Sequence, residues 1–487
     1  MTINEHRLTI NDCRFPSDLT PVSSIQYQVS SIQHPATSNK QQATSIQHHI
    51  NMNYKNQILT KIESNTEVVG IIGLGYVGLP LAVNFAQAGV KVIGFDKSES
   101  KVNKINSGEN YIKDIRDAVL REVVDSIKLE ATTDFTRMNE CDALIICVPT
   151  PLDKFRKPDM SYIEASCVTI GQNMKTGTFI SLESTTYPTT TEDFMLPILE
   201  KESGLKQGTD FWLVYSPERV DPGNVSFHTK NTPKVLGAMT ADGLEIGEKL
   251  YSKAIDKLHL VSSPKVAEMV KILENTYRLI NISLINELAL LSGKMDINIW
   301  EVIEAAKTKP FGFQAFYPGP GIGGHCIPLD PFYLEHIAKR FDFDLSMIHA
   351  AGHINMRMPH YMYIKIATAL NGHKKAVNGS KILFLGVAYK PNIDDERESP
   401  AFEIMDITTR KGGIVSYNDP HIPQILSHGH ESLHSVDLTA EALQNADCVV
   451  LTTNHAAFDI EFIKTNARLI VDMRNMIKEG NDNVYKL

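Results

Sequence analysis

The sequence has few of the features that mark several large classes of protein. Its 487 residues include only six cysteines, which are widely spread and show none of the paired spacings of zinc sites or disulfide-rich domains. No apolar run approaches the roughly 20 residues that cross a bilayer, and the N-terminus has no basic region followed by an apolar core. These absences predict a cytoplasmic protein with no membrane association, no disulfide framework and no metal site.

The chain also has fewer basic than acidic residues. The chain carries 48 Lys and Arg against 57 Asp and Glu, a formal net charge of -9 at pH 7. This balance disfavours nucleic acid and anionic membranes as partners, because both attract proteins with basic surfaces. What is present is an ordinary 43% of hydrophobic residues, and a chain of this length is expected to form two or three domains with apolar cores.

The N-terminal region differs in composition from the rest of the chain. It is rich in Ser, Gln, Asn and His, and it repeats a short phrase as SSIQY from Ser23, SSIQH from Ser30 and TSIQH from Thr44. Such a segment buries too little apolar surface to offset the entropy lost on ordering. We predict that residues 1–64 are a disordered or dispensable extension; the alternative is a regulatory or adhesive tail.

From Glu67 onward, short apolar runs alternate with amphipathic stretches, a pattern typical of parallel sheets flanked by helices. Residues 65–262 contain the predicted strands VVGIIG, VKVIGFD, DALIICVP, TFISLES, FWLVYSP and PKVLGA. Residues 379–487 contain KILFLGVAYK, GGIVSYNDP, DCVVLTTNH and RLIVDMRN. The predicted fold is α/β, with two doubly wound, Rossmann-like parallel-sheet domains joined by a long central helix.

The intervening region, residues 263–378, is predicted to form a central helical domain. Pro264 suits a first helical turn and Gly293 an end, and no other Pro or Gly lies between them. At 1.5 Å per residue such a helix spans on the order of 45 Å, which is longer than one domain usually needs. We expect it to connect the sheet domains and to form the subunit interface of a homodimer or higher homo-oligomer.

A glycine turn follows the first predicted strand and opens a helix. Its residues are Gly73, Leu74, Gly75, Tyr76, Val77 and Gly78. In a dinucleotide site the first glycine allows a tight turn, the second lets the pyrophosphate approach the backbone, and the third packs helix on strand. The next strand ends on Asp96, which would bind a ribose 2'-hydroxyl and repel a 2'-phosphate, so the predicted cofactor is NAD. Lys101 is either a further cofactor contact or a solvated helix charge.

The segment FYPGPGIGGHCIPLD, residues 316–330, contains too much glycine and proline for a helix or a strand and is predicted to be a shaped loop. Cys326 within it is a candidate nucleophile, because nearby polar or basic groups can favour a thiolate. A single cysteine is otherwise more often a small buried hydrophobe. Lys271 and Asn275, four residues apart on the long helix, share one face. They could stabilise an oxyanion, or they could be a polar pair on an exposed helix face.

Six motifs together resemble the UDP-glucose/GDP-mannose dehydrogenase family over about residues 65–487. They are the glycine turn from Gly73, CVPTP from Cys147, SPERVDPGN from Ser216, Lys271 with Asn275, GGHCIPLD from Gly323, and YK...RESP from Tyr389. The resemblance implies an oxidoreductase that uses NAD to oxidise a nucleotide-sugar CH2OH to a carboxylate in two steps. It assigns NAD to the domain of residues 65–262, the catalytic cysteine and dimerisation to 263–378, and the UDP-sugar to 379–487.

The loop wording YPGPGIGGHCIPLDPFYL resembles the branch that acts on UDP-N-acetylglucosamine and yields UDP-N-acetylglucosaminuronate for surface polysaccharide such as capsule or O-antigen. UDP-N-acetylmannosamine and UDP-N-acetylgalactosamine are the alternative substrates. Members of the UDP-glucose type carry a second glutamate four residues after the position of Glu218, where this chain has Pro222. That change is compatible with a pocket remodelled around an N-acetyl group.

The resemblance also implies roles for individual residues. Cys326 attacks the aldehyde formed in the first oxidation, and the thiohemiacetal is oxidised to a thioester that water hydrolyses. Asp330 assists proton transfer, while Lys271 and Asn275 stabilise the oxyanion. The remaining catalytic candidates are Thr150, near the nicotinamide and an ordered water, and Glu218, a general acid or base for thioester hydrolysis.

The sugar nucleotide is expected to contact residues from three parts of the chain. Besides Glu218, Lys271 and Asn275, they are Arg219, Val220, the loop from Tyr317 to Gly323, and Lys390. Arg397 resembles the position that reaches the cofactor from the C-terminal domain. Its alternative role is a salt bridge within the acidic run Asp394, Asp395 and Glu396.

Several other interpretations remain open at this point. A dehydrogenase that stops at an aldehyde or ketone would release one NADH and would not need Cys326. A non-catalytic nucleotide-sugar sensor would bind ligand without turnover. Glu183, at the end of a predicted strand, either lies near the cofactor cleft or is an ordinary strand-end residue. Cys147 and Cys448 lie in apolar strands and are predicted to be core residues.

Overall fold

The computed structural model describes residues 54–112, 115–153, 157–221, 224, 226–324, 326–425, 433–479 and 482–487. Most of the predicted N-terminal extension, residues 1–53, lies outside these ranges, as does Pro222. In the part of the chain that the structure describes, no helix combines the length and apolar composition that a membrane span needs.

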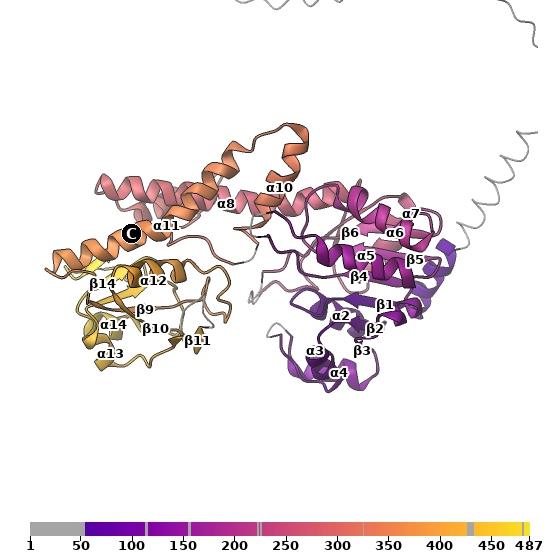
Figure 1. Cartoon of the computed structure of the whole chain (residues 1–487), viewed down its shortest axis with the longest axis horizontal. Helices are drawn as coiled ribbons and strands as arrows, with labels where there is room; N and C mark the ends of the chain where they lie inside the picture. The colour runs from indigo at the N-terminus through magenta and orange to yellow at the C-terminus, as the bar shows by residue number, and fades with distance from the viewer. Residues whose placement is uncertain are drawn as a thin grey trace, which may run out of the picture. The chain divides into compact units, whose positions relative to one another are not determined.

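The first sheet has eight strands in the order β3-β2-β1-β4-β5-β6-β7-β8 (Figure 1). The strands are β1 (Val68–Ile72), β2 (Lys91–Phe95), β3 (Leu129–Thr132), β4 (Ala143–Ile146), β5 (Thr178–Leu182), β6 (Phe211–Tyr215), β7 (Lys234–Ala238) and β8 (Leu258–Val261). Neighbouring strands run parallel except β6 and β7, which are antiparallel. The six predicted strands are confirmed. The sequence analysis missed β3 and β8, because these short edge strands are only partly buried and lack an apolar run.

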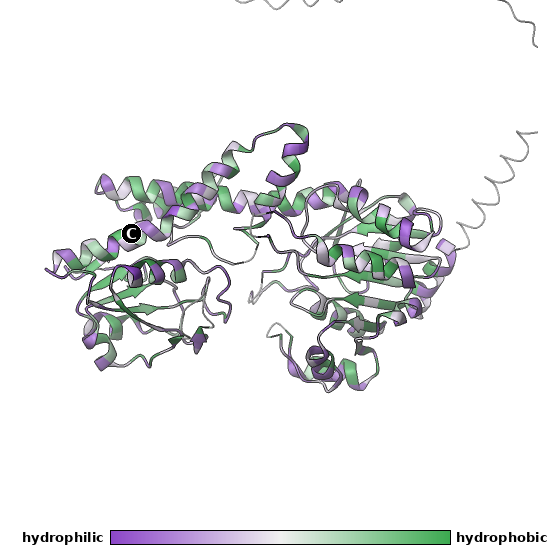
Figure 2. Cartoon of the chain, viewed as in Figure 1, coloured by the Kyte–Doolittle hydropathy of each residue, from purple (hydrophilic) through white to green (hydrophobic). Residues whose placement is uncertain are grey.

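Successive residues of the central strands are buried on opposite faces of this sheet. Ile71 of β1 and Ile145 of β4 belong to one apolar cluster, whereas Ile72 and Ile146, one position along, belong to another. A strand that is buried on both faces reads as a continuous apolar run, which is how these strands appear in the sequence. Figure 2 shows the strands mainly in the hydrophobic colour, while the helices carry both colours. The doubly wound α/β class is therefore confirmed for this domain.

Helices follow the strands in the expected alternation. They are α2 (Gly78–Gln87), α3 (Glu99–Asn106), α4 (Asp117–Asp125), α5 (Ser161–Asn173), α6 (Leu196–Ser203) and α7 (Ala241–Tyr251), with a 3-10 helix at Phe135–Glu140 and a π-helix at Thr190–Met195. Because all but one of the strand pairs are parallel, the carboxyl ends of β1, β2, β4, β5 and β6 lie at the same edge of the sheet. The loops that leave this edge supply the cavity described below.

The central region confirms the predicted long helix. Helix α8 (Pro264–Lys294) has 31 residues, with a proline in its first turn, and it runs through Gly293 rather than ending there. It is followed by α9 (Ile299–Lys307), α10 (Asp330–Ala338), a short 3-10 helix (Lys339–Phe341) and α11 (Ser346–Gly372). Helices α8 and α11 pack against each other (Figure 1), and the Ser283 hydroxyl donates a hydrogen bond to the Ala351 carbonyl, 3.0 Å away.

The C-terminal sheet has five parallel strands in the order β10-β9-β13-β14-β15. They are β9 (Lys381–Leu385), β10 (Ile414–Asn418), β13 (Cys448–Leu451), β14 (Ile470–Asp472) and β15 (Val484–Lys486); β11 (Gln424–Ile425) and β12 (Leu433–His434) form a separate hairpin. Helices α12 (Pro400–Arg410), α13 (Ala440–Asn445) and α14 (Ile460–Asn466) complete the domain. Phe384 and Leu385 belong to apolar clusters on opposite faces, so this smaller sheet is also doubly wound.

Residues 54–64, which the sequence analysis places in the dispensable extension, form a helix packed on the first domain. Ile58 and Ile62 are buried in the same cluster as Ile71. The Lys61 ammonium lies 2.7 Å from an Asp142 carboxylate oxygen, and Lys253 donates to the Ile62 carbonyl. These contacts show that the packed part of the chain starts at or before residue 54, not at residue 65.

We expect two N-terminal truncations to behave differently. Removal of residues 1–53 should leave turnover and the Tm unchanged, because their composition predicts no contribution to a core. Removal of residues 1–64 also deletes two buried isoleucines, which together contribute roughly 3 to 6 kcal/mol through apolar burial, and should lower the Tm. Calorimetry and NADH formation on both truncated proteins test this. Equal Tm values would show that the helix adds no stability.

Candidate active site

A cavity of about 980 Å³ brings together residues from all six of the predicted motifs. Its wall contains most of the glycine turn together with the other candidates Asp96, Lys101, Thr150, Glu218, Val220, Lys271, Cys326 and Arg397. The candidates that do not line it are Gly78, Arg219, Asn275, Tyr317, Gly323, Asp330 and Lys390. A dinucleotide turn and a potential nucleophile therefore face one space, although about 250 residues of sequence separate them.

The glycine turn has the geometry that a dinucleotide site requires. Gly73 has φ +92°, and a Cβ there would lie 2.7 Å from the Cys147 carbonyl oxygen. A Cβ on Gly78 would lie 1.9 Å from the Gly73 carbonyl oxygen, so only glycine lets α2 begin against the turn. A Cβ on Gly75 would meet no atom within 4 Å, which leaves room for a phosphate at the helix N-terminus. The turn therefore fits a dinucleotide pyrophosphate.

Asp96 lies at the end of β2, beside this turn. Its carboxylate accepts hydrogen bonds from the backbone N–H groups of Leu74 and Ser98, at 3.0 and 2.9 Å, and lies 3.4 Å from the Lys101 ammonium. Lys101 is thus paired with Asp96 rather than fully solvated, and because it also lines the cavity, its role as a cofactor contact stays a prediction. The carboxylate at this position favours a free ribose 2'-hydroxyl and hence NAD.

Cys326 lies at the end of the glycine-rich loop, where its carbonyl accepts the Asp330 N–H at 2.8 Å as α10 begins. Among the described cysteines it alone is exposed; Cys141, Cys147, Cys167 and Cys448 are buried, as predicted for Cys147 and Cys448. Protein atoms around the sulfur raise the pKa of Cys326 by disfavouring the thiolate, and Asp330 adds to this effect while Lys271 opposes it. The free enzyme therefore holds a neutral thiol that needs a base to become nucleophilic.

Asp330 is placed to supply such a base. The side chain is buried at the first position of α10, and the Asn275 amide donates to its carboxylate at 2.5 Å. Burial raises the pKa of Asp330 to about 7, with Lys271 and Asn275 acting in the opposite direction. A carboxylate with a pKa near neutrality can both accept and return a proton during turnover.

Lys271 and Asn275 are buried, so the interpretation of an exposed polar pair on α8 is wrong. The Lys271 ammonium donates to the Glu218 carbonyl at 2.7 Å. The Glu218 carboxylate accepts the backbone N–H groups of Arg219 and Val220 through Oε1, while its buried Oε2 has no hydrogen-bond partner among the described residues. A cation and a free carboxylate oxygen are thus available beside Cys326.

Thr150 follows β4 and is buried. Its hydroxyl donates to the Thr185 carbonyl at 2.8 Å, and its own carbonyl accepts the Tyr333 hydroxyl of α10. These bonds connect the loop after β4 with the loop after β5 and with the helix that starts at Asp330.

The predicted substrate contacts lie around a wider region. Arg219 forms an ion pair with Glu274 of α8 and faces a second recess of about 750 Å³. Tyr317 donates to a Glu304 carboxylate oxygen at 2.7 Å and stacks on Trp300. A Cβ on Gly323 would lie 2.7 Å from the Glu398 carbonyl oxygen, which explains why glycine is needed where the cysteine loop meets the RESP turn.

The two basic candidates of the C-terminal domain approach the first domain. The Lys390 ammonium lies 2.6 Å from an Asp221 carboxylate oxygen. Arg397 pairs with Asp395 at 2.7 Å, as the alternative interpretation expected, and its guanidinium also lies 5.7 Å from the ring centre of Tyr76 in the glycine turn. Arg397 therefore forms the salt bridge and still lies beside the glycine turn, on the cofactor side of the cavity.

Arg474 is a candidate that the sequence analysis missed. It follows β14, and its Nε donates to the Thr452 carbonyl at 2.8 Å. Its guanidinium packs so closely on Gly319 of the cysteine loop that a Cβ there would lie 2.3 Å from NH1. Burial lowers the pKa of Arg474 to about 10 by disfavouring its charged form. A single arginine in a strand end has no spacing pattern, so only the tertiary structure could single it out.

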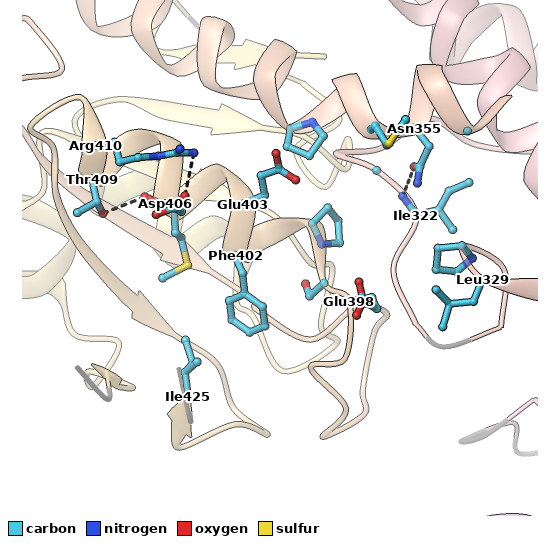
Figure 3. Close-up of a pocket in the computed structure, with 18 of the residues that line it drawn as sticks. Ile322, Leu329, Asn355, Glu398, Phe402, Glu403, Asp406, Thr409, Arg410 and Ile425 are labelled. Carbon is cyan, nitrogen blue, oxygen red and sulfur yellow. Dashed lines mark hydrogen bonds and ion pairs between the residues drawn. The ribbon is translucent and has the colours of Figure 1, made fainter. Parts of the chain in front are cut away.

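A further cavity, of about 1010 Å³, lies behind the cysteine loop and beside α12 (Figure 3). None of the predicted catalytic residues lines it. Figure 3 shows Asn355 of α11 accepting the Ile322 N–H, at 2.7 Å, and the ion pair between Asp406 and Arg410. Asn355, which was not predicted, therefore anchors the cysteine loop in the wall of this further cavity.

Together, a glycine turn on a doubly wound sheet and a cysteine, lysine and carboxylate on the same cavity define an NAD-dependent oxidoreductase with a potential covalent step. Family models agree over almost the whole described chain. Residues 67–255 match the NAD binding domain, 265–357 the central domain and 383–479 the UDP binding domain of the UDP-glucose/GDP-mannose dehydrogenase family. The chain belongs to this family and is an NAD-dependent nucleotide-sugar dehydrogenase.

Individual relatives support the same assignment. The chain is 36% identical over 417 residues to the UDP-N-acetyl-D-mannosamine dehydrogenase of Pyrococcus horikoshii, covering 84% of this chain and 96% of the relative. It is 34% identical over 392 residues to the UDP-N-acetyl-D-glucosamine 6-dehydrogenase of Pseudomonas aeruginosa, covering 80% and 88%. The solved structure of UDP-D-ManNAc dehydrogenase from P. horikoshii superimposes with a TM-score of 0.78 at 34% identity, covering 86% of this chain and 98% of that one.

Proposed function

We propose that this enzyme oxidises C6 of a UDP-N-acetylhexosamine to the uronate, and that UDP-N-acetylglucosamine is its substrate. The observation that carries the two-step reaction is the shared cavity, in which Cys326 and Lys271 face the same space as the dinucleotide turn. A dehydrogenase that stopped at the aldehyde would not need an exposed thiol there. A non-catalytic sensor would not need a buried carboxylate with a pKa near 7 beside that thiol.

The proposed reaction proceeds through two successive covalent intermediates on Cys326. NAD, held by the glycine turn and Asp96, would supply the hydride acceptor for both oxidations. Cys326 adds to the aldehyde carbon while Asp330 takes the thiol proton, giving a thiohemiacetal. Lys271 and Asn275 stabilise the negative charge on its oxygen until that carbon is oxidised to a thioester. Water then attacks the thioester with Glu218 accepting its proton, and the sulfur of Cys326 leaves and recovers a proton. In sum, alcohol, water and two NAD⁺ give carboxylate, two NADH and three protons.

Binding of the nucleotide portion is assigned to residues at the edge of this site. Arg219, Val220 and the loop from Tyr317 to Gly323 would contact the sugar and the uridine. Lys390 and Arg474 would neutralise the diphosphate, because their charges lie near the cysteine loop and a guanidinium binds phosphate oxygens in a bidentate manner. Arg397 would contact the cofactor across Tyr76.

Two observations bear on the sugar. The sequence of the loop from Tyr317 and the presence of Pro222 in place of a second glutamate favour an N-acetylated sugar. The second candidate substrate is UDP-N-acetylmannosamine, favoured by the relative of 36% identity, whereas the UDP-N-acetylglucosamine 6-dehydrogenase is 34% identical. The two sugars differ only in configuration at C2, and we assign the choice to the loop that carries Tyr317.

The test supplies NAD separately with UDP-N-acetylglucosamine, UDP-N-acetylmannosamine, UDP-N-acetylgalactosamine and UDP-glucose, following NADH by absorbance and product by mass. Two NADH per uronate, fastest with UDP-N-acetylglucosamine, is the expected result. Two NADH with a different sugar would keep the mechanism and change the substrate. One NADH per product would indicate a single-step dehydrogenase, and none with any sugar would indicate a sensor.

We also propose that the enzyme is a homodimer or a higher homo-oligomer assembled through α8. Large apolar side chains are exposed along this helix at intervals of three or four residues, except for one gap of seven. They are Val266, Met269, Leu273, Tyr277, Leu284, Leu288 and Leu291. An exposed apolar stripe of this length is typical of a surface that another chain covers.

Leu284→Glu is expected to shift the protein from dimer to monomer, because the charge would be buried without a partner in the interface. Light scattering after size-exclusion chromatography measures the change. Lys201→Glu, on the exposed face of α6, is the control and should leave the mass unchanged. An oligomer that persists at micromolar concentration in the Leu284 variant would contradict assembly through this stripe.

A further inference from the structure

A second charged network lies beneath the cavity, outside the set of residues assigned to the mechanism. Glu183 at the end of β5 and Lys234 at the start of β7 form an ion pair whose two side chains are almost completely buried. The Tyr251 hydroxyl donates to the other oxygen of Glu183 at 2.5 Å and lies 2.8 Å from the Ser181 hydroxyl. Burial raises the pKa of Glu183 to about 7.

This network touches the chain segment that carries Glu218. The Lys234 ammonium donates to the Pro217 carbonyl, 3.2 Å away. The next carbonyl along, that of Glu218 itself, accepts the Lys271 ammonium at 2.7 Å. Two lysines from different elements, β7 and α8, thus hold the two successive carbonyls on either side of the Glu218 Cα, from which the candidate hydrolytic carboxylate extends.

Stability alone does not account for the buried ion pair of Glu183 and Lys234. Buried ion pairs lose much of their attraction to desolvation, and neutral residues of similar volume often replace them at no cost. Two further features connect the pair to the site. Glu183 contributes to the wall of the same cavity as Glu218, Lys271 and Cys326. Ser216, one residue before Pro217, is held by its hydroxyl to the Val235 carbonyl at 2.8 Å, next to Lys234 in sequence.

We propose that Lys234, oriented by Glu183 and Tyr251, is a positioning residue for the hydrolytic half of the reaction. By holding the Pro217 carbonyl, it fixes the turn from which Glu218 directs its unpartnered oxygen to the water that attacks the thioester. In that step the water oxygen bonds to the acyl carbon, the carbon–sulfur bond breaks, the sulfur electron pair returns to Cys326, and the water proton passes to Glu218. The inference rests on the proposed function, and it assigns Lys234 no part in either oxidation.

Lys234→Met tests this inference in single-turnover experiments with excess enzyme. Both NADH equivalents should form at rates close to those of the wild-type protein, whereas thioester hydrolysis should slow on the order of 10²-fold, as expected when a group is displaced by about 1 Å. The thioester should then accumulate on Cys326, visible as a mass increase of the intact protein and captured by hydroxylamine. KM for NAD and for the sugar nucleotide should change little.

Removing one partner of a buried ion pair also destabilises the fold, so a second variant separates the two effects. Glu183→Gln together with Lys234→Met leaves no buried charge and should recover the Tm, yet it still lacks the bond to Pro217 and should keep the hydrolytic defect. Lys234→Gln, a neutral donor in the same space, should retain part of the hydrolytic rate and provides a test should the methionine variant not fold.

A matched pair elsewhere in the domain serves as the control. Lys253 and Glu67 form a 2.6 Å ion pair in which Glu67 is buried, away from the cavity lining. Lys253→Met, alone or with Glu67→Gln, should alter the Tm without any accumulation of thioester.

Recovery of both the Tm and the hydrolytic rate in the Glu183/Lys234 double variant would overturn the inference, because the pair would then serve stability alone. Thioester accumulation in the Lys253 variants would also overturn it, since the effect would be unspecific. If the proposed function were wrong, the wild-type protein itself would release a single NADH and show no covalent intermediate. That result is distinct from a failure of the inference about Lys234, which concerns the variants.

Discussion

Cys326→Ser is expected to abolish uronate formation while leaving NAD binding intact. Removal of a covalent nucleophile commonly costs on the order of 10³-fold or more in turnover, and a serine hydroxyl near neutral pH is a far weaker nucleophile than a thiol. The change is nearly isosteric at a side chain that is exposed to the cavity, so folding should not suffer. Acid production is measured by mass spectrometry, and NAD affinity by calorimetric titration.

The burial of the other cysteines supplies an independent check on this residue. Because Cys326 is the exposed cysteine among those described, one equivalent of iodoacetamide bound at this position should inactivate the enzyme in parallel with modification. NAD and a sugar nucleotide should slow the modification by occupying the cavity. A serine variant that makes acid at the wild-type rate would exclude covalent catalysis at Cys326.

Asp330→Asn is expected to lower kcat by roughly 10²- to 10⁴-fold, the usual effect of removing a general base. In the wild-type protein kcat should fall as the pH drops below about 7, because the pKa of Asp330 is raised to about 7 and only the carboxylate accepts a proton. That acidic limb should disappear in the variant. The amide can still accept the hydrogen bond that Asn275 donates, so the geometry of the site should survive.

The same substitution should raise the stability of the folded protein although it lowers kcat. The pKa of Asp330 is higher in the folded protein than its ordinary value of 3.8, so the unfolded chain loses this proton first. Ionisation of Asp330 therefore reduces stability as the pH rises from about 4 to 7, and the whole reduction is present above pH 7. We expect Asp330→Asn to raise the Tm at pH 8 and to have little effect at pH 4.

A control and a competing assignment complete this test. Asp344→Asn, at an exposed carboxylate before α11, should change neither the pH profile nor the Tm at pH 8. Glu183 and Glu268 are also buried carboxyl groups whose pKa is raised to about 7. If the acidic limb persisted in Asp330→Asn, one of these residues, rather than Asp330, would be responsible for it.

Local sequence was sufficient wherever the chemistry depends on backbone shape. Gly73 and Gly78 could be predicted because a left-handed residue and a close helix contact each exclude a side chain, and the structure shows both constraints. The loop around Cys326 was predictable for the same reason. The apolar runs of the central strands also indicated the sheets, since strands buried on both faces cannot tolerate polar residues.

Elements with weak local patterns required the tertiary structure. Strands β3 and β8 are four residues long and lie at the edges of the sheet, where they are only partly buried or exposed, so neither forms a long apolar run. The helix at residues 54–64 follows a polar segment, and only its packing through Ile58 and Ile62 shows that it belongs to the first domain. Helix propensity and hydrophobic periodicity do not specify the surface on which a segment packs.

The sequence by itself indicated the class of reaction, because the glycine turn, the cysteine loop and the Lys271–Asn275 pair stand among six motifs that together resemble one dehydrogenase family. Only the tertiary structure decided which distant groups support them. Lys234 of β7 reaches Pro217 after the neighbouring strand β6 and Glu183 after β5, one strand further. Arg474 reaches the cysteine loop from the other sheet. The physical reason is that a buried charged group is tolerated only where the fold brings it a hydrogen-bond acceptor or an opposite charge, and that partner has no fixed distance along the chain.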